Sequence, residues 1–175
     1  TSNLQHLKVG DELYLEKIPY GYLTLARYQL PLPQDLWLLG TGTGLAPFLS
    51  MLQDFETWNN YKQINLVYSV RTQAELAYVE RIQEIAESFG EGHSGFKFIP
   101  IITRDPEAAL HDRLPVLIAN GELEKAAAMQ LNPETSHVML CGNPDMVEDT
   151  KEALKARGLT MNRRGEGNIA VENYW

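Results

Sequence analysis

The chain has 175 residues, of which 44% are hydrophobic and 22% charged, a composition that fits one globular domain with a buried core and room for part of a second. Fifteen Lys and Arg against 23 Asp and Glu leave a formal net charge of -8, which argues against general nucleic-acid binding. No apolar run approaches the roughly 20 residues that a membrane-spanning helix needs, and no signal-peptide pattern opens the chain, so we expect no membrane association.

Residues 1–33 are predicted to be the C-terminal part of an antiparallel β-barrel. Apolar runs at 13–15 and 22–25 are typical of short strands, and a proline-containing linker ends at Pro33. The first residue is Thr1 rather than Met, so we expect the chain to be a piece of a longer protein and the beginning of the barrel to be absent.

Residues 34–175 are predicted to form a nucleotide-binding domain of the α/β class. Strand-like apolar runs alternate with helix-like periodic segments, which is typical of a five-stranded parallel sheet that is doubly wound with helices. The predicted strands are 36–39, 64–69, 96–102, 137–141 and 168–172. The predicted helices are 46–58, 73–88, 114–120, 122–128 and 144–157.

The stretch GTGTGLAPFLS, residues 40–50, joins the first predicted strand to the first predicted helix. Glycines allow a tight turn and a close approach of the backbone to a ligand, and a helix start presents free N–H groups to a phosphate. The loop is not a Walker A sequence, because no Gly-Lys-Ser/Thr follows. It also departs from the usual dinucleotide fingerprint, because Leu45 or Pro47 stands at the third glycine position, depending on where the count starts. Thr41, Gly42, Thr43 and Gly44 are candidate pyrophosphate ligands, although this loop alone also fits a tight turn that binds nothing.

Arginines follow the next two strands. Arg71 comes directly after the second strand, Thr103 and Arg104 after the third, and Arg113 stands before the next helix. Arginine binds a phosphate dianion in bidentate fashion, and in dinucleotide folds it accommodates the 2′-phosphate of NADP. Each arginine by itself could be a solvated surface charge, but their joint placement favours NADP over NAD.

Two further candidate segments end the fourth and fifth strands. Cys141 is the last residue of the fourth strand and Gly142 follows it, and Tyr174 and Trp175 follow the fifth strand. Because ligands of open α/β sheets bind outside the carboxyl ends of the strands, all these features should meet at one edge of the sheet. Cys141 is the single cysteine, which excludes an internal disulfide or a cysteine metal cluster and favours the cytoplasm. We expect no metal site.

These segments together resemble the ferredoxin/flavodoxin–NADP reductase family, especially its bacterial branch. The matching stretches are GTGTGLAPFLS, VYSVR, ITRD, CGNPDMV and the terminal VENYW. The resemblance implies an oxidoreductase that exchanges electrons between NADPH and a one-electron carrier, ferredoxin or flavodoxin, through bound FAD. A flavin suits this reaction because it takes two electrons at once from a hydride and passes them on singly.

The resemblance also implies roles for single residues. Cys141 matches a cysteine that lies beside the nicotinamide, Glu172 a carboxylate that relays protons to the flavin, and Trp175 a terminal aromatic residue that stacks on the flavin ring. Tyr174 and Gly142 belong to the same cofactor site. The family's main flavin motif, of the Arg-x-Tyr-Ser type, does not occur in these residues, so we expect this chain alone to be inactive and not to retain FAD.

Two alternatives stay open at this point. The chain could belong to an NAD(P)H-dependent reductase component that serves an oxygenase or free flavin. It could also be a nucleotide-binding module without enzymatic activity, because the flavin motif is missing.

Overall fold

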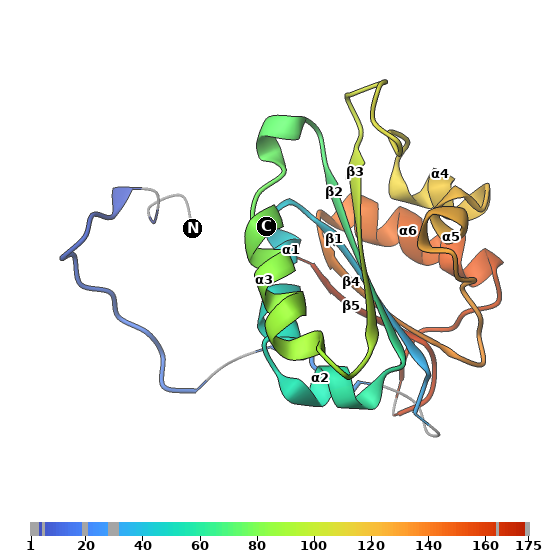
Figure 1. The fold of residues 1–175 in the computed structure, drawn as a ribbon, viewed down its shortest axis with the longest axis horizontal. Helices are drawn as coiled ribbons and strands as arrows, with labels where there is room; N and C mark the ends of the chain where they lie inside the picture. Colours follow the sequence, from blue (N-terminus) through green and yellow to red (C-terminus); the bar gives the residue numbers. More distant parts are fainter. Residues whose placement is uncertain (1–3, 5, 19–20, 28–31, 164, 174–175) are drawn as a thin grey trace.

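A single parallel sheet organises the protein (Figure 1). The structure, a computed structural model, describes residues 4, 6–18, 21–27, 32–163 and 165–173. The sheet has five strands in the order β3-β2-β1-β4-β5, and every neighbouring pair is parallel. The strands are β1 (Asp35–Thr41), β2 (Gln63–Val70), β3 (Gly95–Ile102), β4 (Ser136–Gly142) and β5 (Ile169–Asn173). The prediction of a five-stranded parallel α/β domain is confirmed.

Helices cover both faces of the sheet. One face carries α1 (Leu45–Leu52), α2 (Phe55–Asn60) and α3 (Val79–Gly90), and the other carries α4 (Leu114–Ala119), α5 (Glu122–Ala127) and α6 (Pro144–Ala156), as Figure 1 shows. Successive side chains of a strand point to opposite faces. In β1, Leu36 and Leu38 therefore join one buried cluster, while Trp37 and Leu39 join the other.

Two of the predicted helices are interrupted. The segment 46–58 divides into α1 and α2 because Asp54 is extended and its side chain accepts a hydrogen bond from the Glu56 N–H at 2.9 Å, which caps α2. The segment 73–88 begins with a short 3₁₀ turn, η3 (Gln73–Glu75), and α3 starts only after Tyr78, which has a left-handed backbone at φ 63°.

Both predicted boundaries of helix α6, its start and its end, are confirmed. The Asn143 side chain accepts hydrogen bonds from the N–H groups of Asp145 and Met146, and Pro144 occupies the first turn. Gly158 follows the helix with φ 88°, a conformation that favours glycine. The sequence signals for helix ends therefore worked best where a capping residue and a proline stood together.

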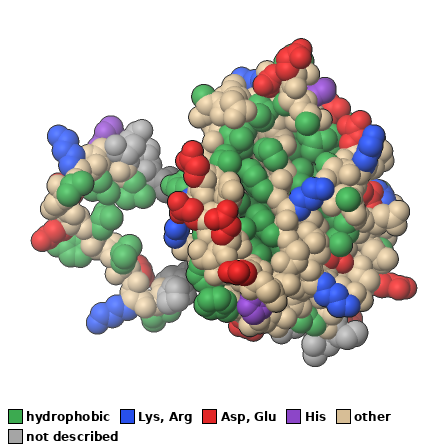
Figure 2. Space-filling view, viewed as in Figure 1, with side chains coloured by type: hydrophobic (Ala, Val, Ile, Leu, Met, Phe, Trp, Pro, Cys, Tyr) green, Lys and Arg blue, Asp and Glu red, His purple; other side chains and the backbone are tan. Residues whose placement is uncertain are grey.

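The N-terminal segment contains no strand in its described residues, so the strands predicted at 13–15 and 22–25 are wrong in this structure. A strand needs a second strand to accept and donate its backbone hydrogen bonds. Figure 1 shows much of this segment lying away from the sheet, and Figure 2 shows apolar side chains on its surface. Tyr14 and Leu15 are 96% and 87% exposed. Nearer the domain, Leu23 is buried in the cluster that contains Leu36.

Candidate functional site

An open cavity of about 1250 Å³ lies at the carboxyl ends of the strands. Its walls come from the loops that follow β1, β2 and β3 and from the first turns of α4 and α6. Of the predicted site residues, those that line it are Thr41, Gly42, Thr43, Arg71, Thr103, Arg104 and Arg113. The topology thus brings together residues from three separate strand ends.

The loop after β1 presents open backbone to this cavity. Gly42 to Gly44 form a 3₁₀ turn, η2, that leads directly into α1. Gly42 has φ 53°, and a Cβ atom there would meet nothing within 4 Å. The glycine is therefore required by the turn and not by packing, and the space beside it is free for a ligand to approach the backbone.

Gly44 and Gly142 serve a different purpose from Gly42. A Cβ atom on Gly44 would overlap the carbonyl group of Cys141, and one on Gly142 would overlap Thr41. The Asn143 N–H also donates a hydrogen bond to the Thr41 hydroxyl at 3.2 Å. These two glycines let the loops after β1 and β4 pack together, and neither of them lines the cavity.

The arginines lie beside one another because the β2–β3 pairing continues past the ends of the strands. The backbone N–H of Arg104 donates a hydrogen bond to the Arg71 carbonyl at 2.8 Å. The backbone N–H and the hydroxyl of Thr103 both donate to the Val70 carbonyl, at 2.9 and 3.2 Å. Arg113 is the residue that precedes α4, on the adjacent wall. Within the part of the chain that the structure describes, the side chains of Arg104 and Arg113 form no ion pair.

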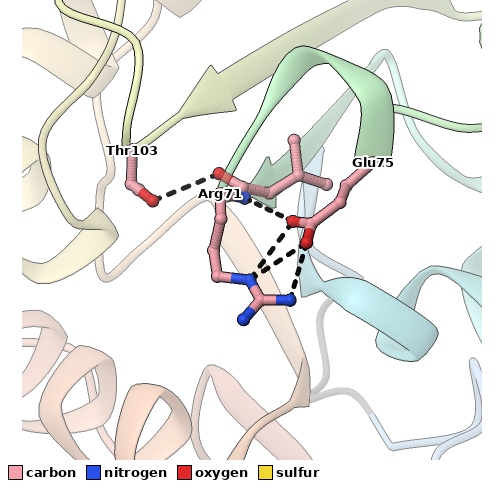
Figure 3. A network of polar contacts seen from close by, with 4 residues as sticks. Arg71, Glu75 and Thr103 are labelled. Carbon is pink, nitrogen blue, oxygen red and sulfur yellow. Dashed lines mark hydrogen bonds and ion pairs between the residues drawn. The ribbon is translucent and has the colours of Figure 1, made fainter.

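Arg71 differs from the other two because its guanidinium is already held by a carboxylate (Figure 3). The Nη2 atom lies 2.6 Å from Glu75 Oε1, and this contact raises the pKa of Arg71 and lowers the pKa of Glu75. Glu75 was missed at the sequence level, although its position four residues after Arg71 could have indicated the pair. The cavity-lining Tyr78 was also missed, and nothing in the sequence signals its left-handed backbone.

Acidic side chains also line the cavity. Asp112 directly precedes Arg113, and Asp145 and Asp149 lie on the first turns of α6. A phosphate group would therefore find a more favourable potential beside Arg71 and Arg104 than beside α6. Among the described residues, no group of three or more His, Cys, Asp and Glu side chains is arranged to hold a metal ion.

Cys141 and Glu172, on β4 and β5, do not line the cavity. Cys141 is fully buried, and burial together with the nearby Glu172 carboxylate raises its pKa to about 12. The thiol is therefore protonated at neutral pH. Glu172 is half-buried on β5, and its Oε1 lies 3.7 Å from where a Cβ atom of Gly21 would be. Tyr174 and Trp175 lie outside the described residues.

Comparisons with known proteins identify a family model and several similar relatives. The family described as oxidoreductase NAD-binding domain matches residues 38–152. The chain is 40% identical to the ferredoxin–NADP reductase of Pseudomonas aeruginosa, covering 98% of this chain and 68% of that protein. It is 39% identical to the flavodoxin/ferredoxin–NADP reductase of Buchnera aphidicola, covering 98% of this chain and 66% of the relative.

A solved structure is similar as well. The ferredoxin–NADP⁺ reductase of Neisseria gonorrhoeae, determined with bound FAD and NADP, is 36% identical, with a TM-score of 0.79 over 89% of this chain and 61% of that one. The chain thus spans about two thirds of the length of the relatives that it matches. None of the helices in the described ranges has both the length and the apolar character needed to cross a bilayer.

Proposed function

The chain belongs to the ferredoxin/flavodoxin–NADP reductase family, and we propose that it is the nucleotide-binding part of an enzyme that exchanges electrons between NADPH and ferredoxin or flavodoxin through FAD. The observation that carries this proposal is the cavity in which the loop Thr41–Gly42–Thr43 faces Arg71, Arg104 and Arg113. We place the enzyme in the cytoplasm.

The cavity residues suit NADP in two ways. The loop after β1 would hold the pyrophosphate, because open backbone at Gly42 and the N–H groups at the start of α1 favour an anion there. Arg104 and Arg113, which lack acidic partners among the described residues, would neutralise the 2′-phosphate together with Arg71. Without that phosphate, the arginines would gain little from the ligand, so the site favours NADP over NAD.

The residues outside the cavity retain the roles that we predict from the family. When bound, FAD supplies the exchange between a two-electron hydride and single electrons. Cys141 would contribute a small, polarisable neutral side chain near the nicotinamide and no thiolate chemistry, in line with its raised pKa. Glu172 would move a proton near the flavin. Trp175 would cover the flavin ring and yield to the nicotinamide, and Tyr174 would belong to the same cofactor site.

We also propose that residues 1–33 are the last part of a flavin-binding barrel and that residues 34–175 form the NADP-binding domain. The exposed side chains of Tyr14 and Leu15 support this division, because apolar surface of this kind is normally covered by other protein. The chain alone would then fold through its sheet domain but would not retain FAD. A yellow full-length protein would exclude the alternative of a nucleotide-binding module without flavin.

Calorimetry with two small ligands tests the NADP assignment on the chain itself. We expect 2′,5′-ADP to bind more tightly than 5′-AMP, and Arg104→Ala to remove on the order of 1.5–3 kcal/mol of that preference, as is typical of a charge-assisted contact. Arg81→Ala is the control, because Arg81 pairs with Glu84 on α3 and does not line the cavity. Equal affinity of the unmodified chain for the two ligands would refute the assignment.

A further inference from the structure

The Glu75 carboxylate holds one specific edge of the Arg71 guanidinium. Oε1 accepts hydrogen bonds from Nη2 at 2.6 Å and from Nε at 3.1 Å, and Oε2 accepts from Nε at 3.3 Å. Oε2 also accepts a hydrogen bond from the Arg71 backbone N–H at 3.0 Å. One carboxylate therefore fixes both the side chain and the backbone of the same residue.

This arrangement leaves the other end of the guanidinium available. Figure 3 shows that the one guanidinium nitrogen without a dashed line, Nη1, points away from Glu75. A guanidinium carries five N–H groups in a rigid fork, and a phosphate binds best to two of them that lie parallel. The end formed by Nη1 and the outer hydrogen of Nη2 fulfils this condition without displacing Glu75.

Arg71 would be poorly ordered without this contact. Its side chain is 64% exposed, and the structure gives it no side-chain partner other than Glu75 among the described residues. Immobilising a long side chain at the moment of binding weakens affinity by roughly 2- to 10-fold. A guanidinium that is already oriented avoids that penalty.

We propose that Glu75 is a positioning residue that selects the 2′-phosphorylated dinucleotide by holding the Arg71 guanidinium with its free end directed into the cavity. This inference rests on the proposed function, because it presumes that the arginines bind a 2′-phosphate. The three arginines would then contribute differently to phosphate binding. Arg104 and Arg113 supply net positive charge, whereas the Arg71–Glu75 pair, which is neutral overall, presents correctly oriented N–H donors to the 2′-phosphate.

Calorimetry with 2′,5′-ADP and 5′-AMP on Glu75→Ala and Glu75→Gln tests the proposal. Glu75→Ala should bind 2′,5′-ADP about 2- to 10-fold more weakly while its affinity for 5′-AMP stays unchanged. Glu75→Gln should lose less, because the amide oxygen still accepts from the guanidinium. Both variants remove the charge, so the difference between them measures orientation.

The double variant Arg71→Ala/Glu75→Ala separates positioning from a general effect on the loop. If Glu75 acts through Arg71, the double variant should bind 2′,5′-ADP no more weakly than Arg71→Ala alone. Glu84→Ala is the matched control, since it breaks an exposed Arg–Glu pair on α3 outside the cavity, and it should leave both affinities unchanged.

Three results would overturn the inference alone. These are unchanged or tighter 2′,5′-ADP binding by Glu75→Ala, a further loss when Glu75→Ala is added to Arg71→Ala, and a loss for 5′-AMP as large as that for 2′,5′-ADP. A different result, no discrimination between the two ligands by the unmodified chain, would overturn the proposed function and this inference with it.

Discussion

Polar side chains at the two ends of the strands differ in burial and in their hydrogen-bond partners. At the amino ends, Asp35 is buried and accepts hydrogen bonds from Trp37 Nε1 at 2.7 Å and from the Ser136 hydroxyl at 2.6 Å. Close by, the Tyr61 hydroxyl lies 2.6 Å from His137 Nδ1. At the carboxyl ends, by contrast, the arginines face an open cavity. The amino edge therefore satisfies the Asp35 carboxylate internally and stabilises the fold, while the carboxyl edge leaves the side chains of Arg104 and Arg113 available to a ligand.

The largest effect should come from breaking the buried network at the amino edge. Asp35→Ala removes the acceptor of two buried donors, so we expect it to lower the free energy of unfolding by about 3–4 kcal/mol, measured by urea denaturation. Asp112→Ala, an exposed aspartate at the cavity, should change that free energy by no more than about 0.5 kcal/mol. Similar losses in the two variants would show that the edges do not differ in this way.

The pH dependence of stability should come partly from His137. Burial lowers the pKa of His137 from 6.5 to about 4, so between these values the unfolded chain takes up a proton that the folded chain does not. The contribution of His137 to the free energy of unfolding is therefore fully present above pH 6.5, and roughly 2–3 kcal/mol of it should be lost as the pH approaches 4.

Urea denaturation at several pH values, with His137→Gln as control, isolates this contribution. Burial raises the pKa of Asp35, which opposes the loss near the acidic end, but Asp35 is present in both proteins. The variant should show a smaller decline between pH 6.5 and 4. An identical decline would mean that His137 is not the group responsible.

A smaller effect should distinguish the two kinds of glycine at the carboxyl edge. Gly44→Ala places a methyl group against the Cys141 carbonyl and should cost about 2 kcal/mol of stability. Gly42→Ala meets no neighbour and only has to adopt φ 53°, which should cost about 1 kcal/mol. Thermal unfolding measures both, and a greater loss for Gly42→Ala would contradict the packing role of Gly44.

The sequence predicted the sheet, and it predicted that the loop after β1 and the arginines share one edge, because both depend on short-range signals. Apolar runs marked the strands, and in a parallel sheet every strand end that carries Arg71 or Arg104 must lie at the same edge. Helix ends were predicted correctly at Asn143, where a capping side chain precedes Pro144. They were missed at Asp54 and Tyr78, where a single residue interrupts an otherwise continuous helical pattern.

The remaining features depend on contacts between distant segments. No spacing rule reveals that Gly44 packs on the carbonyl of Cys141, which is distant in the chain, or that Cys141 itself is fully buried. The strand predictions at 13–15 and 22–25 failed for a related reason, because periodicity describes a segment but does not supply its partner. The roles of Tyr174 and Trp175 stay predictions.

The most direct test of the account is to locate bound 2′,5′-ADP on the chain by backbone amide chemical shifts. We expect the shifts on titration to change at Gly42, Thr103, Arg104 and Arg113, and to stay constant at Asp35 and Ser136 at the opposite edge. Changes confined to the amino edge, or none at the arginines, would contradict the assignment of the carboxyl edge as the nucleotide site.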